Sequence, residues 1–134
     1  MPPLTMPPSN EDFRRGLELG VDLFNRGHFF DAHEVLEDLW RSLPRDRPGR
    51  RHLRLHVQGM IQLAVAFHHQ STGNYTGALS VLKRAVRNLN GAERSFPELD
   101  LGRLRAELAD WETHLAGVGA RPQPPHVFKL KGTR

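Results

Sequence analysis

The segment GHFFDA at residues 27–32 recurs further along the chain as GNYTGA at residues 73–78, an offset of 46 residues. Both copies contain a glycine, any residue, an aromatic residue, two further residues and an alanine. Glycine can take the left-handed backbone conformation that ends a helix, and a small alanine lets two helices approach closely. We expect the aromatic side chain to fill the corner between them. Each copy therefore predicts a helical hairpin.

Apolar residues recur at helical spacing on both sides of each glycine, and no segment shows the alternation of a strand. The stretch HLRLHVQGMIQLAVAFHHQS is apolar nearly all round, which is typical of a buried central helix. The sequence predicts an all-α fold, a five-helix compact bundle built on two related helical hairpins. The expected helices cover about 11–26, 29–43, 52–71, 75–92 and 100–116, the last of them capped by Asp100.

The length of 134 residues fits one domain with its own core. Proline and glycine interrupt the C-terminal tail, whose Val127, Phe128 and Leu130 either pack on the bundle or leave the tail mobile. The sequence predicts a flexible N-terminus over residues 1–10 and a single helical domain over 11–118. The motif core of this domain covers 24–90, and an extended C-terminal tail covers 119–134.

The chain has no cysteine, which excludes disulfides, thiolate catalysis and cysteine-ligated metals within it and fits a reducing compartment. The first residues, MPPLTMPPSN, have neither the basic start nor the apolar run of a signal peptide. The polar interruptions of the central helix argue against a membrane span. We expect a cytoplasmic protein that does not enter the membrane.

The net charge is +4, and its excess lies in one segment. Residues 41–54 hold six arginines against Asp46, so the rest of the chain is close to neutral. Such a loop can attract phosphate or RNA, with Arg45, Arg47, Arg50, Arg51 and Arg54 as the contacts. Because the chain shows no nucleic-acid-binding motif and uses arginine for most of its basic residues throughout, we rank this interpretation last.

The second helix carries a polar motif, His33-Glu34-x-x-Glu37-x-x-Trp40. The i, i+4 spacing stacks His33 on Glu37, and Trp40 flanks the apolar face. One interpretation is a divalent metal site in which His33 and Glu37 are ligands and Glu34 is the base of a hydrolase, although the second histidine of the zinc-protease motif is replaced by Glu37. The alternative is a structural network in which the imidazole and the carboxylate satisfy each other.

The central helix adds Gln58, Gln62 and His69 on one side of an otherwise apolar surface. Buried amides require hydrogen-bond partners. If the second and third helices pack together, these side chains can reach the polar groups of the second helix. The combined polar cluster would then form either a closed network or an open pocket, and the two interpretations stay open at this point.

The segment FNRGHFFDAHEVLEDLW (24–40), followed by VQGMIQLAVAFHHQSTGNYTGAL (57–79), resembles the bacterial and archaeal domain of unknown function DUF309. The resemblance covers about 24–90 and implies a compact α-helical fold in a small cytoplasmic protein, with no established activity. The two hairpins are also similar to those of tetratricopeptide repeats, whose usual period is shorter. The family pattern carries over onto Asn25, Gly27, Phe30, Ala32, His33, Glu34, Glu37, Trp40, Gln58, Gly59, Ile61, Gln62, Ala64, Gly73, Asn74 and Ala78.

These observations favour a non-enzymatic binding or interaction module with a polar His/Glu/Gln cluster between the second and third helices. A metal-dependent hydrolase is the alternative, so the sequence leaves open whether the chain is an enzyme. We expect no cofactor in the first case and a divalent metal in the second. The expected partner is a protein or a small molecule, and a homodimer is a common outcome for small bundles.

Overall fold

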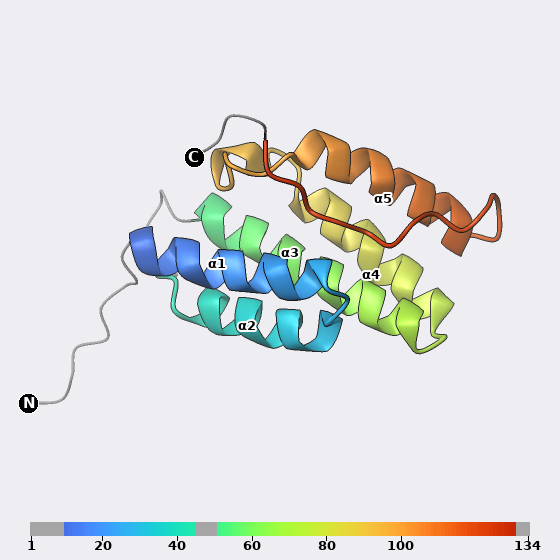
Figure 1. Ribbon diagram of the computed structural model, residues 1–134, viewed down its shortest axis with the longest axis horizontal. Helices are drawn as coiled ribbons and strands as arrows, with labels where there is room; N and C mark the ends of the chain where they lie inside the picture. The colour runs from blue at the N-terminus through green and yellow to red at the C-terminus, as the bar shows by residue number, and fades with distance from the viewer. Residues whose placement is uncertain (1–9, 45–50, 131–134) are drawn as a thin grey trace, which may run out of the picture.

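The computed structural model describes residues 10–44 and 51–130 (Figure 1). This part of the chain forms no strand, only one antiparallel bridge between Leu99 and Lys129. The predicted all-α bundle is therefore confirmed. None of the described helices is long and apolar enough to cross a membrane. The elements are α1 (Asn10–Asn25), α2 (Phe29–Arg41), α3 (Arg51–Ser71), α4 (Tyr75–Asn88), the 3-10 turn η2 (Ala92–Arg94) and α5 (Leu101–Leu115).

The hairpins α1–α2 and α3–α4 turn with the same backbone geometry. Gly27 and Gly73 have φ angles of +83° and +86°, in the left-handed region that favours glycine. The residue after each glycine donates its backbone N–H to the carbonyl five residues earlier, at 2.9 Å in the first hairpin and 2.8 Å in the second. Ala32 and Ala78 are fully buried. The repeat read from the sequence is thus a repeat of backbone geometry.

The aromatic position of the repeat differs between the two hairpins. Phe29 packs against Phe24 and Phe67, with ring centroids 5.2 and 5.8 Å away, so it fills the first corner as predicted. Tyr75 is 52% exposed, and the same prediction is wrong for the second corner. There the side chain of Asn74 caps α4 by accepting a backbone N–H at 3.0 Å, a bond that His28 does not make in the first hairpin.

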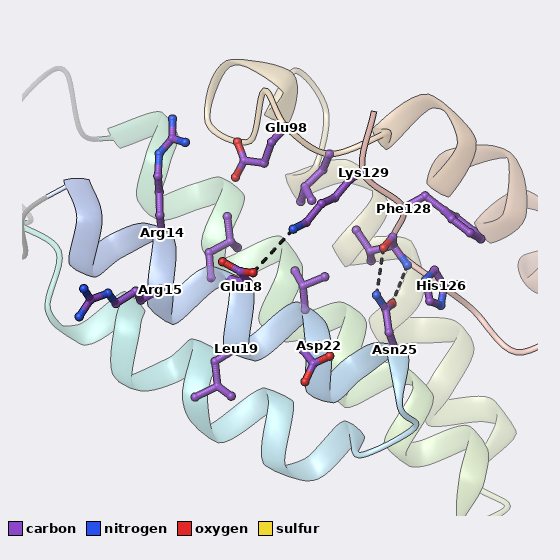
Figure 2. A pocket seen from close by; sticks show the side chains of 14 residues that line it. Arg14, Arg15, Glu18, Leu19, Asp22, Asn25, Glu98, His126, Phe128 and Lys129 are labelled. Carbon is purple, nitrogen blue, oxygen red and sulfur yellow. Dashed lines mark hydrogen bonds and ion pairs between the residues drawn. The ribbon is translucent and has the colours of Figure 1, made fainter. Parts of the chain in front are cut away.

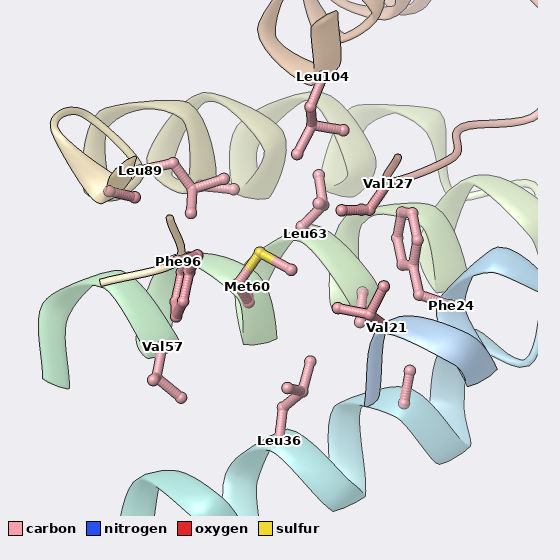
Figure 3. Packing of buried hydrophobic residues seen from close by; sticks show 14 of the residues in the cluster. Val21, Phe24, Leu36, Val57, Met60, Leu63, Leu89, Phe96, Leu104 and Val127 are labelled. Carbon is pink, nitrogen blue, oxygen red and sulfur yellow. The ribbon is translucent and has the colours of Figure 1, made fainter. Parts of the chain in front are cut away.

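Helix α3 is the central helix, as predicted, because it packs against α2 on one side and α4 on the other. Met60 lies between Leu36 of α2 and Leu89 at the end of α4, whereas Leu63 points toward Leu104 of α5 (Figure 3). All five side chains are at most 2% exposed. Apolar residues are therefore needed all round α3. This explains why the apolar residues of its sequence are not confined to one face of the helix.

Helix α5 covers α4 and contacts α3. Its Trp111 is 1% exposed and meets Phe67 of α3 edge to face, with centroids 5.1 Å apart. Arg105 of α5 donates two hydrogen bonds of 2.6 Å to Glu93 of η2. A bidentate pair of this kind fixes the turn between α4 and α5.

Two helix ends differ from the sequence expectation by more than one residue. The helix predicted to reach residue 92 ends at Asn88, because Gly91 has a φ of +75° and the chain continues as η2. The helix predicted to reach residue 43 ends at Arg41, where the hydroxyl of Ser42 donates to the carbonyl of Leu39 at 2.6 Å. Asp100 caps α5 as expected. The predicted flexible N-terminus, apart from residue 10, lies outside the described residues.

Residues 126–130, called the C-terminal segment below, run along the bundle between α5 and α1 (Figure 1, red). Val127 is 2% exposed, whereas Leu130 is 43% exposed. Of the two possibilities left open by the sequence, this part of the tail packs on the bundle. Residues 131–134 lie outside the described part of the chain.

The close approach of α1 and α2 depends on Gly20, and we expect Gly20→Ala to lower the free energy of unfolding by about 1 to 2 kcal/mol. A Cβ at this position would lie 2.6 Å from Cδ2 of the buried Leu36. Gly102→Ala in α5 is the matched control, because its nearest neighbour would be 3.8 Å away. This control should gain about 0.5 kcal/mol of helix propensity. Urea unfolding of both variants checks the contrast, and equal effects would contradict it.

Candidate functional site

The predicted stacking of His33 on Glu37 is present in α2. His33 Nε2 lies 2.8 Å from Glu37 Oε2, and the side chains are 25% and 31% exposed. The other oxygen of Glu37 accepts a hydrogen bond from Arg41, whose guanidinium also lies 3.5 Å from Asp38. Glu37 therefore has a partner on each oxygen, so both of its oxygens are already engaged within α2 itself.

Phe30 lies beside this pair on the outer surface of α2. Its side chain is 52% exposed, and its ring centroid is 5.8 Å from that of His33 and 5.5 Å from that of His68 at the end of α3. Two imidazoles from two helices thus flank one exposed aromatic ring. Phe30, His33, Glu34, Glu37 and His68 are together called the Phe30 surface.

Arg54, from the arginine-rich segment, has a structural position at the other end of α2. Its guanidinium lies 4.0 Å above the ring of Trp40 and donates to the backbone carbonyls of Trp40 and Leu43 at 3.0 and 2.8 Å. A cation at a helix C-terminus is also favoured by the helix dipole. Arg51 is exposed at the start of α3. The remaining predicted phosphate contacts, Arg45, Arg47 and Arg50, lie outside the described residues.

The polar residues of α3 do not join the His33–Glu37 pair. Gln62 Oε1 accepts a hydrogen bond of 2.7 Å from Asn88 of α4, on the opposite side of α3 from α2. His69 Nδ1 lies 3.4 Å from the amide of Asn74, next to the second turn. Gln58 is half-buried, and Glu34 is exposed. The predicted cluster is thus divided between two sides of α3, because a helix packed on both sides offers partners in both directions.

The described residues contain no group of three His, Asp or Glu side chains arranged to hold a metal ion. The two proposed ligands, His33 and Glu37, instead contact each other. This arrangement is the mutual satisfaction of imidazole and carboxylate that the sequence left as the alternative.

One buried polar group that the sequence analysis did not select is His56. It is 2% exposed at the start of α3, and its Nδ1 lies 2.6 Å from the hydroxyl of Ser95 beyond η2. Burial is the main cause that lowers the pKa of His56 below its ordinary value of 6.5, and a backbone hydrogen bond at Asn90 partly opposes it. Its position between Leu55 and Val57 in an apolar helix is the only sequence signal of its burial.

Asn25, at the end of α1, makes two hydrogen bonds that the sequence could not show. Its Nδ2 donates to the carbonyl of Val127 at 3.0 Å, and its Oδ1 accepts the N–H of Val127 at 2.7 Å. The same amide therefore binds both backbone groups of one residue. The two residues are 102 positions apart, and Asn25 was selected only as a position of the family pattern.

A groove of about 690 Å³ lies between α1 and the C-terminal segment (Figure 2). Arg14, Arg15, Glu18 and Asp22 line the α1 side, so its charges are mixed. Across the groove, Lys129 Nζ lies 3.6 Å from Glu18, a weak pair because both side chains are well exposed.

Comparison with known sequences finds a similarity to one family model. Residues 17–81 match the model described as Domain of unknown function (DUF309). These residues, called the DUF309 segment below, are therefore similar to the DUF309 family. The DUF309 segment contains Asn25 and the whole Phe30 surface, whereas α5 and the C-terminal segment lie outside it.

Two relatives share this similarity. A protein of Aquifex aeolicus (strain VF5), described as uncharacterized, is 29% identical over 87 residues, which are 65% of this chain and 25% of the relative. Uncharacterized protein YpuF of Bacillus subtilis (strain 168) is 36% identical over 78 residues, 57% of this chain and 42% of the relative. The matched region thus spans less than half the length of either relative.

The buried His56 predicts a pH dependence of stability. The unfolded chain takes up a proton at His56 near pH 6.5, whereas the folded chain resists protonation until a lower pH. We therefore expect the free energy of unfolding to fall as the pH drops below about 6.5, and His56→Gln to reduce this slope between pH 7 and pH 5. Urea unfolding across this range measures it.

Glu93 does not contribute in this range, because the hydrogen bonds from Arg105 lower its pKa to about 2 and its effect begins below 4.5. An identical slope in the wild type and His56→Gln would contradict the assignment.

Trp40 provides packing without a hydrogen bond from its indole, because its buried Nε1 has no partner in the described structure. We expect Trp40→Phe to change the free energy of unfolding by less than about 1 kcal/mol, since a phenyl ring keeps the contact with Arg54 and removes an unpaired donor. Trp40→Ala should lower it by about 3 kcal/mol. Urea unfolding followed by circular dichroism compares the two, and similar losses would contradict the prediction.

Proposed function

We propose that the protein is a non-enzymatic interaction module that binds a partner protein through the Phe30 surface. The observation that carries the proposal is the exposed ring of Phe30, held between His33 and His68. An aromatic side chain at an exposed position supplies a large contact area at small entropic cost, and such side chains dominate binding energy at interfaces. The neighbouring Phe29 already serves the core, so Phe30 is not needed there.

The charges around Phe30 support a partner that carries a basic residue beside an apolar one. Asp31, Glu34 and Asp38 are exposed on the same helix, and α2 has a net negative charge. Helix α4 has the opposite character, with Lys83, Arg84 and Arg87 exposed and no acidic residue. A basic partner is therefore attracted to α2 and repelled by α4. These charges orient the partner as it approaches.

The proposal requires no metal or other cofactor, and the contact of His33 with Glu37 serves in it to orient the imidazole beside Phe30. We place the module in the cytoplasm, where a chain without cysteines is suited to reducing conditions. Nucleic acid is disfavoured as the ligand of this surface because α2 is acidic.

A photoreactive benzoyl-phenylalanine at position 30 of the full chain, introduced in the source cells, tests the proposal. The matched control is the same residue at position 75, since Phe30 and Tyr75 are each 52% exposed. We expect a discrete cross-linked protein at position 30 that is absent at position 75 and is weakened by Glu34→Lys. The same products at both positions, or none at position 30, would contradict it.

The identified partner then allows a quantitative test with purified protein. Phe30→Ser should weaken binding at least about tenfold, as expected for a side chain at the centre of an interface. The free energy of unfolding should change by no more than about 0.5 kcal/mol, because the ring is largely exposed. Tyr75→Ser should leave the affinity unchanged. Equal binding by the Phe30 and Tyr75 variants would exclude the Phe30 surface as the contact.

A further inference from the structure

The Asn25 amide is arranged to bind extended backbone rather than a particular side chain. Its two hydrogen bonds, 3.0 and 2.7 Å long, engage the C=O and the N–H of Val127. The Val127 side chain, 2% exposed, occupies an apolar position behind them. Main-chain hydrogen bonds combined with a pocket for a single side chain are the usual way in which a protein binds an extended peptide.

The opposite edge of the C-terminal segment is paired within the chain. Asp100 N–H donates to the carbonyl of Phe128 at 2.7 Å, and Leu130 N–H donates to the carbonyl of Glu98 at 3.0 Å. Because backbone groups alternate along an extended segment, the N–H and C=O of Lys129 face the same side as those of Val127. In the described structure they have no hydrogen-bond partner, and this side is lined by the groove against α1.

We propose that Asn25 and the adjoining groove form a binding site for an extended segment of another protein, and that the C-terminal segment occupies this site in the free chain. The present occupant shows the chemistry that the site accepts. It is a branched aliphatic residue at the position of Val127, followed by an aromatic residue, since Phe128 lies under the Arg103 guanidinium at 3.5 Å. This site is separate from the Phe30 surface, and neither proposal depends on the other.

The tail after α5 is held at a small number of positions. Pro125 and Val127 are buried and the carbonyl of Gln123 accepts a hydrogen bond of 3.1 Å from Trp111, whereas Lys129 and Leu130 are exposed. Glycines at positions 117 and 119 with positive φ precede the C-terminal segment, in an exposed connection after α5. The DUF309 segment supplies Asn25, whereas the occupant comes from outside that segment. The site and its occupant are thus separate parts of the sequence, as expected for an exchangeable contact.

The occupant in trans is another protein rather than a second copy. A tethered segment has an effective concentration in the millimolar range, so the same segment from a second copy gains nothing over it. A competing segment must make additional contacts. The groove of about 690 Å³ beside the present occupant provides room for them.

The test uses the full chain with Val127→Asp, which weakens the internal contact, and a fluorescein-labelled peptide of residues 122–130, PQPPHVFKL. We expect saturable binding in fluorescence anisotropy, and at least tenfold weaker binding to the wild type. Asn25→Ala added to Val127→Asp should abolish it, as should an aspartate in place of valine in the peptide. A folded Val127→Asp chain that does not bind the peptide, or binding that is independent of Asn25, would overturn the proposal.

Hydrogen exchange of the unmodified chain gives a second test that does not depend on how the variants fold. The amides of Val127 and Leu130 should exchange at least tenfold faster than that of Leu63 in the core, because the segment opens locally. Equal rates would show that the segment opens only with global unfolding and would overturn the proposal. A concentration-dependent dimer of the wild type that Asn25→Ala abolishes would identify a second copy as the occupant and would also overturn it.

Discussion

The burial of α3 on both sides is the constraint on which the rest of the structure depends. A helix packed against α2 and α4 at once needs apolar residues all round, and its neighbours must each turn an apolar face toward it. Helix α3 joins the two hairpins. It packs against α2 of the first hairpin and against α4 within its own hairpin. The remaining surfaces of α2 and α4 are then free to be polar, and they carry opposite charges.

The sequence predicted those features that depend on local spacing. The left-handed glycines at 27 and 73, the cap at Asp100 and the central position of α3 all follow from short-range patterns. The His33–Glu37 contact was predictable for the same reason, since both residues lie on one helix at i, i+4 spacing. Local periodicity therefore gave the fold and one pair of the candidate site.

The partners of the other polar residues depend on packing between elements and could not be read from the sequence. A helical wheel places Gln62 on a side of α3, but that side is shared by two neighbours, and its partner proves to be Asn88 of α4. Tyr75 occupies the repeat position of Phe29 and is nevertheless exposed. Asn25 finds its partner 102 residues away, in a tail without any periodic pattern. Contacts between residues that are distant along the chain were therefore the ones that the sequence could not predict, whatever the residue type.

The C-terminal segment links the two ends of the described chain, and its contacts explain why α1 can carry a polar residue at the edge of the core. Without Val127, the half-buried Asn25 amide would lose both hydrogen-bond partners and would be open to water. Because water competes with the Val127 backbone for this amide, each of the two hydrogen bonds contributes only modestly to stability. The DUF309 segment by itself does not contain that backbone. The hydrogen-bond partner of Asn25 therefore comes from outside the DUF309 segment, in this chain from its own tail.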